Sequence, residues 1–142
     1  MSKDLILQPM VAMMLLTAIV WLYMYAKRIP AMKNAKVSVQ TYTTPEKAVE
    51  LLPDSVNYSA HNLKNLFELP VLFYGLCLLL YVTQTVDMTY LIAAWAFFVL
   101  RVLHSLVHCT VNIVILRFYL YAAGSLALWF MLLRAAIDTF AP

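Results

Sequence analysis

Residues 61–82 read HNLKNLFELPVLFYGLCLLLYV, and this stretch decides the fold. After a few polar turns it becomes an apolar run, and as a helix it is long enough to cross the hydrocarbon core of a bilayer. The polar turns hold His61, Lys64, Asn65 and Glu68. Because charges at membrane depth cost free energy, polar side chains gathered there indicate a functional site.

The composition excludes a soluble domain. Hydrophobic residues make up 64% of the 142 residues and charged residues only 12%, whereas about 25% charged is usual in soluble domains. The chain has only two glycines and is rich in leucine, alanine and methionine, which favours helices over the short alternating strands of a membrane barrel. The net charge of +3 comes from basic residues beside apolar runs, so we expect no nucleic-acid partner.

Four apolar runs predict an all-α integral membrane protein, a four-transmembrane-helix bundle formed by a single domain over residues 1–142. The predicted spans are residues 7–26, 60–82, 88–108 and 112–137, and the predicted polar loop is residues 27–59. Pro30 is expected to end the first helix, and Pro70 is expected to kink the second. Within the loop, Thr44 is expected to cap a short helix that begins at Pro45.

The basic residues predict the orientation in the membrane. Eight of the ten Lys and Arg residues belong to the side that holds the first and third connections, and only Lys3 and Arg134 lie on the other. Cytoplasmic loops carry the excess of basic residues in membrane proteins. We therefore expect both termini to lie outside the cytoplasm, with the first and third connections inside it.

Polar side chains from three spans are expected to meet at this cytoplasmic end. Within each span they recur at intervals of three or four residues, which places them on one helical face. The three sets are His61, Asn65 and Glu68; Arg101, His104 and His108; and Arg117 with Tyr121. If the three faces point inward, they form a cationic pocket suited to a small anionic ligand reached from the cytoplasm.

Several of these residues also have structural interpretations. Glu68 is equally explained as an ion-pair partner of Arg101 or of a lysine on a neighbouring helix. Asn65 is explained as a partner of the backbone or of Glu68, and Lys64 as a side chain that extends to the lipid headgroups.

The histidines raise the alternative of a metal or haem site. His104 and His108 have a spacing that permits one metal, but the sequence fixes no third ligand, so we predict no metal. Arg117 has no comparable structural explanation, because it lies about a turn and a half inside the fourth span and needs a partner or a ligand there.

These residues resemble a known family. Asn65-Leu66-Phe67-Glu68 resembles the second-helix N-x-x-E signature of the MAPEG proteins, the membrane-associated proteins of eicosanoid and glutathione metabolism. Arg101-x-x-His104 is similar to the third-helix pattern. Arg117 and Tyr121 are similar to the fourth-helix arginine and tyrosine of the prostaglandin E synthase and microsomal glutathione transferase branch. The resemblance covers nearly the whole chain.

The resemblance implies a homotrimer that binds glutathione between adjacent subunits, toward the cytoplasm. The arginine that matches Arg117 contacts the sulfur, and a fixed cation favours the nucleophilic thiolate. Tyr121 and His108 are the other expected catalytic residues, and a lipophilic substrate is expected to arrive from the surrounding lipid. The expected glutathione-binding residues are Arg28, His61, Lys64, Asn65, Glu68, Arg101 and His104.

The chain also departs from the family pattern. His61 and Lys64 stand where several eukaryotic members have arginine, His108 stands where one branch has tyrosine, and Phe118 replaces a hydroxyl residue. Arginine clamps carboxylates with two hydrogen bonds and histidine or lysine cannot, so a different thiol or anion stays open. The second-helix segment resembles bacterial members, which implies the inner or plasma membrane of a bacterium.

The function predicted from the sequence is a membrane-bound, glutathione-dependent transferase or peroxidase acting on lipophilic electrophiles or lipid hydroperoxides. The first alternative is a non-catalytic lipid-binding or scaffold protein with the same fold. The second is a haem or quinone subunit that uses the histidines. The physiological substrate is not fixed by the sequence.

Overall fold

The computed structural model describes residues 2–140, which are 85% helical and contain no strand. Four helical stretches are long and apolar enough to cross a membrane, so the chain is an all-α, multi-pass integral membrane protein, as predicted. Met1, Ala141 and Pro142 of the predicted domain lie outside the described residues. The elements are η1 Lys3–Ile6, α1 Leu7–Asn34, η2 Val39–Thr41, α2 Pro45–Leu51, α3 Asp54–Leu66, α4 Leu69–Val82, α5 Met88–Cys109 and α6 Val114–Phe140.

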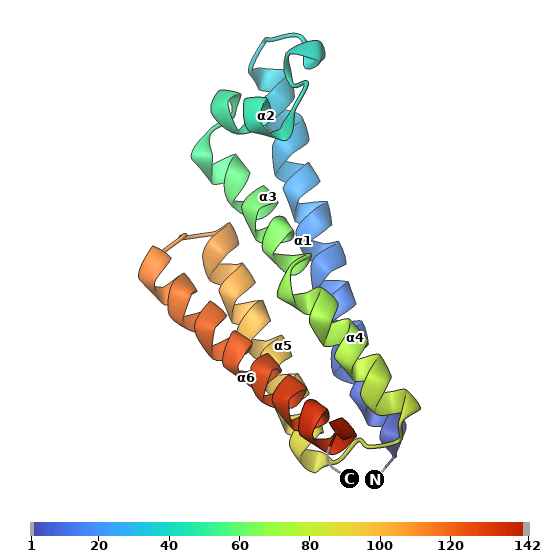
Figure 1. Ribbon diagram of the computed structural model, residues 1–142. Helices are drawn as coiled ribbons and strands as arrows, with labels where there is room; N and C mark the ends of the chain where they lie inside the picture. The colour runs from blue at the N-terminus through green and yellow to red at the C-terminus, as the bar shows by residue number, and fades with distance from the viewer. Residues whose placement is uncertain (1, 141–142) are drawn as a thin grey trace.

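The helices form two packed groups (Figure 1). Helix α1 lies along α3 and α4, which follow one another as the second span, and α5 packs chiefly on α6. The two ends of the described chain lie together at one end of the bundle, here called the terminal end, and α2 marks the opposite α2 end. The α5–α6 connection faces the α2 end but lies closer to the middle of the molecule, so α1 and α3 extend beyond it.

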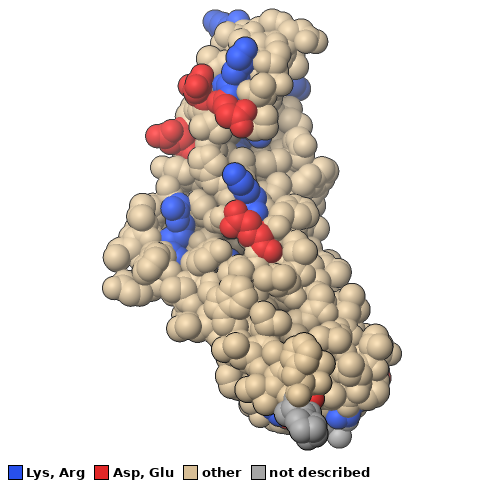
Figure 2. Space-filling view, viewed as in Figure 1, with Lys and Arg blue, Asp and Glu red and all other residues tan. Residues whose placement is uncertain are grey.

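Apolar side chains fill the space between the helices in the terminal half of the bundle. Phe73 of α4 and Phe97 of α5 are fully buried, and their ring centroids lie 4.6 Å apart. In lipid, such contacts stabilise the bundle through close packing, because the surrounding acyl chains are as apolar as the core. On the face shown in Figure 2, charged side chains lie over the α2 end, at mid-height and at the terminal tip, with a wide uncharged band between the last two.

Helix α1 is longer than the predicted span of residues 7–26. The prediction that Pro30 ends this helix is wrong, because α1 continues to Asn34 and Ala35 still donates a backbone hydrogen bond to Ala31. Proline removes one backbone donor from a helix. Pro30 is exposed, so water can solvate the carbonyl that loses its partner, and the helix tolerates the loss. The segment between α1 and α3 is therefore residues 35–53, shorter than the predicted loop of residues 27–59.

The second span is interrupted rather than kinked. It begins six residues earlier than predicted, at Asp54, and α3 ends at Leu66. The backbone of Glu68 leaves helical geometry, with φ −96° and ψ −103°, and Pro70 then occupies the first turn of α4. A proline in the first turn needs no backbone donor. Pro70 therefore helps to start a new helix, and the prediction that it kinks a continuous one is wrong.

The remaining boundaries lie close to the predictions. Helix α5 ends one residue beyond the predicted span of residues 88–108, and α6 begins two residues later and ends three residues later than residues 112–137. The short helix α2 begins at Pro45, and the Thr44 hydroxyl accepts a hydrogen bond from the Lys47 backbone, at 3.3 Å. This cap confirms the predicted start of α2.

Candidate functional site

The buried face of α5 changes from apolar to polar along its length. Toward the terminal end the buried residues include Phe97, and toward the α2 end they include Arg101, His104 and His108. The last three lie on one face, as their spacing predicts, and each is at most 3% exposed. This face points into the bundle. A cation and two imidazoles are therefore buried near the α2 end of α5, whereas apolar core side chains are buried along the rest of the helix.

Arg101 is the least satisfied polar side chain of this face. It is 1% exposed, and none of its three guanidinium nitrogens has a hydrogen-bond partner within residues 2–140. The guanidinium carbon lies 4.2 Å from the ring centroid of Tyr121 and 5.1 Å from that of Phe97. Stacking on two rings partly offsets the cost of burial, but a buried cation without an acceptor still calls for an explanation.

The two histidines of α5 form a small aromatic cluster with Tyr121. The ring centroids of His104 and His108 lie 5.4 Å apart, and those of His104 and Tyr121 lie 5.7 Å apart, all in edge-to-face arrangements. The Nδ1 atoms of both histidines are buried and have no hydrogen-bond partner in the described part of the chain. These rings are thus packed, but the Nδ1 atoms of the two histidines are not used by any residue among 2–140.

A pocket of ≈ 270 Å³ opens beside this cluster, here called the α5–α6 pocket. It brings together part of each of the three polar faces that the sequence predicts to meet. Its lining residues are Asn65 of α3, His104 of α5, and Val114, Arg117, Phe118 and Tyr121 of α6. Arg101 lies behind Tyr121, so its charge acts on the pocket without lining it.

Arg117 is held in place by the connection that precedes α6. Its guanidinium donates to the side-chain oxygen of Asn112. Asn112 has a left-handed backbone (φ 49°), a conformation that asparagine tolerates better than most residues. Asn112 was not singled out from the sequence, although an asparagine between two predicted spans is a turn signal.

The α5–α6 pocket is suited to a small anion. Arg117 supplies a cation at its wall and Arg101 a second one behind it, while Asn65, Tyr121 and His104 supply neutral hydrogen-bonding groups. A carboxylate or a thiolate is the kind of group that two fixed guanidinium ions favour. Within residues 2–140, no group of three or more His, Cys, Asp and Glu side chains is arranged to hold a metal ion.

The other predicted binding residues line a different pocket. This second pocket, of ≈ 700 Å³, lies between α1, α2 and α3 and is here called the α2 pocket. Arg28, His61 and Lys64 line it together with Glu46 and Glu50 of α2. The two glutamates were missed, although their i, i+4 spacing after a predicted helix start was a usable signal.

The predicted face of His61, Asn65 and Glu68 is divided by the structure. His61 lines the α2 pocket and Asn65 lines the α5–α6 pocket, while Glu68 is exposed and lines neither. Glu68 makes no hydrogen bond or ion pair through its side chain within the described residues, so the alternative that it pairs with Arg101 is not realised in this chain. Glu68 leaves the predicted face because it lies in the break between α3 and α4 and no longer follows the helical repeat.

A second buried polar group links α3 to α5 and was not identified from the sequence. The Asn62 amide donates to the Cys109 sulfur at 3.5 Å, and the Ser105 hydroxyl donates to the Asn62 side-chain oxygen at 3.4 Å. All three side chains are buried. These contacts satisfy one another, which makes a structural role in holding the two helices together the simplest explanation.

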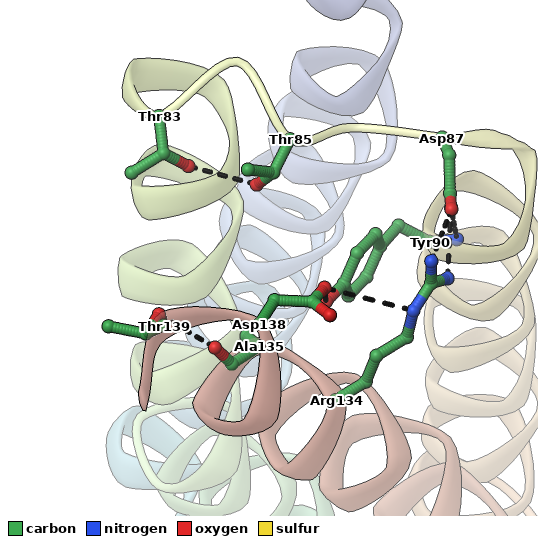
Figure 3. Close-up of polar contacts among 8 residues, drawn as sticks. All are labelled: Thr83, Thr85, Asp87, Tyr90, Arg134, Ala135, Asp138 and Thr139. Atoms are coloured by element: carbon green, nitrogen blue, oxygen red, sulfur yellow. Dashed lines mark hydrogen bonds and ion pairs between the residues drawn. The ribbon is translucent and has the colours of Figure 1, made fainter. Parts of the chain in front are cut away.

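The terminal end carries a polar cluster in which the charges are paired (Figure 3). Arg134 of α6 forms ion pairs with Asp87, which precedes α5, and with Asp138, and its guanidinium carbon lies 4.3 Å from the ring centroid of Tyr90. The Tyr90 hydroxyl donates to Asp138 at 2.8 Å. The Arg134 guanidinium, through its hydrogen bonds, holds the pKa of the Asp87 carboxyl below its usual value. We call these four residues the terminal ion-pair cluster.

Comparison with known proteins gives one result that agrees with this architecture. The family model of the MAPEG family matches residues 6–137, nearly the whole chain. No curated protein and no solved structure matches the chain. The matched range includes most of each of the four spans and every residue that lines the α5–α6 pocket.

Proposed function

This chain belongs to the MAPEG family, and we propose that it is a membrane-bound enzyme that activates a thiol, with glutathione as the expected one, for reaction with lipophilic electrophiles or lipid hydroperoxides. The observation that carries the proposal is the α5–α6 pocket. Arg117 lies at its wall, and Arg101 lies behind Tyr121 with no hydrogen-bond partner among residues 2–140. Two cations in this position would stabilise an anion that binds between the helices.

The proposed role of Arg117 is to stabilise the thiolate. A thiol is a poor nucleophile until it loses its proton, and a nearby fixed cation lowers the free energy of the charged form. Arg117 is partly buried and oriented by Asn112, so its guanidinium is already positioned before the substrate arrives. Tyr121 faces the same pocket and is the proposed second contact to the sulfur.

The remaining predicted binding residues require a neighbouring subunit in this proposal. Arg28, His61 and Lys64 line the α2 pocket, whereas Arg117 lines the α5–α6 pocket. We propose that the protein is a homotrimer in which a cofactor between subunits reaches cations from both pockets. The lipophilic substrate would enter from the lipid that surrounds the helices.

The proposed orientation places the α2 end in the cytoplasm and the terminal end on the opposite side. The support is the distribution of Lys and Arg, most of which belong to the α2 end of the chain. The membrane proposed from the sequence resemblance is the inner or plasma membrane of a bacterium. In this orientation both pockets would be reached by a water-soluble thiol from the cytoplasm.

The first experiment is thermal unfolding of the detergent-purified protein with and without glutathione. A ligand that binds only the folded state stabilises it by about 2.7 kcal/mol at a hundred times its dissociation constant. We expect millimolar glutathione to raise the melting temperature of the wild type and of the control Arg134→Ala, but not that of Arg117→Ala. No shift in the wild type would remove glutathione as the cofactor.

The second candidate function is lipid binding without catalysis. The observation that favours it is an apolar groove of ≈ 220 Å³ between α1 and α5, whose lining includes Leu16, Ile19, Val102 and Leu106. A groove of this kind fits an acyl chain better than a thiol. Copurification of a stoichiometric lipid, together with no response to glutathione, would favour this function over the first.

A further inference from the structure

The three histidines of this chain lie in a series that leads away from the α5–α6 pocket. His104 lines that pocket, and His108 lies one turn further along α5 toward the α2 end. His61 lines the α2 pocket and is exposed, whereas His104 and His108 are buried. The series therefore runs from the proposed reaction centre to the surface of the α2 end.

We propose that His104, His108 and His61 form a proton relay that carries the thiol proton from the α5–α6 pocket to water. The inference rests on the proposed function, because a thiol that becomes a thiolate in this cationic pocket must give up its proton. The S–H bond breaks, its electron pair stays on sulfur, and the proton passes to His104. His104 releases a proton to His108, and His108 releases one through His61 to water, so that the solvent gains the proton that the thiol loses.

The chemistry of imidazole suits each step. A neutral imidazole has one N–H group and one acceptor nitrogen, so it can take a proton on one side of the ring and release one from the other. The rings of His104 and His108 lie edge to face with centroids 5.4 Å apart, a gap that one water molecule or a small ring rotation can bridge.

The unused ring nitrogens are the observation that separates a relay from simple packing. A histidine with a structural role commonly has one ring N–H fixed by a carbonyl or a carboxylate. The Nδ1 atoms of His104 and His108 have no such partner among the described residues, although both are buried. Groups that are free to exchange protons in this way are what a relay needs.

The charges around His104 disfavour a proton that remains on this ring. Arg117 lines the α5–α6 pocket together with His104, and Arg101 lies over the ring of Tyr121, which packs against His104. Nearby positive charges disfavour an imidazolium ion. A proton taken up from the pocket is therefore short-lived on His104, and in the proposed relay it moves on through His108 to the exposed His61.

The test is the rate of proton release when the detergent-purified, full-length protein is mixed with glutathione. A pH indicator in weakly buffered solution follows the proton, and ultraviolet absorbance follows the thiolate. His108→Phe keeps a ring of similar shape but cannot carry a proton, and we expect it to slow both signals about 10²-fold. Its equilibrium affinity for glutathione should change little, and added imidazole should restore the rate.

Ser105→Ala is the matched control, because Ser105 is buried beside His104 on α5 and bonds to Asn62 outside the relay. It should release the proton at the wild-type rate. His61→Gln changes an exposed residue, and it is expected to slow release in the same direction even if His108→Phe fails to fold.

Two negative results have different meanings. The first is that glutathione binds and the thiolate forms, but His108→Phe releases the proton at the wild-type rate without imidazole. That result overturns the relay and leaves the thiol assignment in place. If His108→Phe does not fold, the same result with His61→Gln has the same meaning. If the wild type forms no thiolate at all, the proposed function is overturned, and the relay with it.

Discussion

Two arginines of this chain lie over tyrosine rings at nearly the same distance but in opposite surroundings. The guanidinium carbon of Arg101 lies 4.2 Å from the Tyr121 centroid, and that of Arg134 lies 4.3 Å from the Tyr90 centroid. Arg134 is partly exposed and paired with two aspartates, whereas Arg101 is buried and has no hydrogen-bond partner within residues 2–140.

The difference separates a structural cation from one that is available to a ligand. A paired arginine holds the elements that supply its partners, which at the terminal end are α6 and the α4–α5 connection. An unpaired buried arginine contributes no such link and carries a desolvation cost. A protein that keeps it gains something other than stability, and the adjacent α5–α6 pocket provides a reason.

The largest expected effect is a loss of turnover when a cation of the α5–α6 pocket is removed. Arg117→Ala removes the cation that we place at the sulfur, and we expect it to lower the thiol-dependent rate by about 10²–10³-fold, as when one charge-stabilising donor is removed from an active site. The measurement is turnover with glutathione and a lipophilic electrophile, or with a lipid hydroperoxide.

Arg134→Ala provides the opposite arm of this comparison. It removes a cation of similar geometry from the terminal end, and turnover should stay near the wild-type value at a temperature where the variant is folded. Equal losses in the two variants would contradict the division between a functional and a structural end.

The next largest effect is on stability, and it comes from the terminal ion-pair cluster. Arg134→Met keeps most of the side-chain length and removes the charge, and we expect it to lower the free energy of unfolding by about 1 kcal/mol. A double-mutant cycle with Asp87→Asn isolates the pair, and we expect a coupling energy of about 0.2–1 kcal/mol because both side chains are partly exposed. A coupling energy of zero would show that the ion pair does not hold the terminal end together.

The smallest expected effect is a dependence of stability on acid. The folded pKa of Asp87 is lowered by Arg134, so the contribution of Asp87 is present above its unfolded pKa of about 3.9 and is lost as the pH falls through the lower folded value. The melting temperature of the wild type should therefore decline below about pH 4 more steeply than that of Asp87→Asn. If the melting temperatures of the two proteins fall in parallel as the pH is lowered, the Asp87 carboxylate makes no pH-dependent contribution to stability.

The sequence predicts the residues of the site better than their grouping. Periodicity places Arg101, His104 and His108 on one face of α5, and the structure buries that face. The same periodicity fails for Glu68, because it assumes an unbroken helix, and it does not anticipate that His61 and Asn65 of α3 line different pockets. Whether a proline bends a helix or starts a new one depends on the backbone before it, which the sequence alone does not determine.

The division into two pockets was also beyond sequence reasoning. Arg28 was grouped with Arg117 through a family resemblance, but within one chain the two arginines line different pockets. The extension of α1 past Pro30 depends on solvation of an exposed turn, and the contact of Arg117 with Asn112 depends on a left-handed residue in a short connection. These are tertiary features, and composition and spacing carry little information about them.

The most direct test of the account is the melting temperature of Arg101→Met without and with glutathione. Methionine fills similar space without a charge, so removal of an unpaired buried cation should leave the melting temperature without ligand unchanged or raised, as when buried charges are replaced by apolar residues. The stabilisation by glutathione should become smaller in the same variant. A melting temperature far below that of the wild type without ligand would contradict the account, because it would show that Arg101 holds the fold together as Arg134 does.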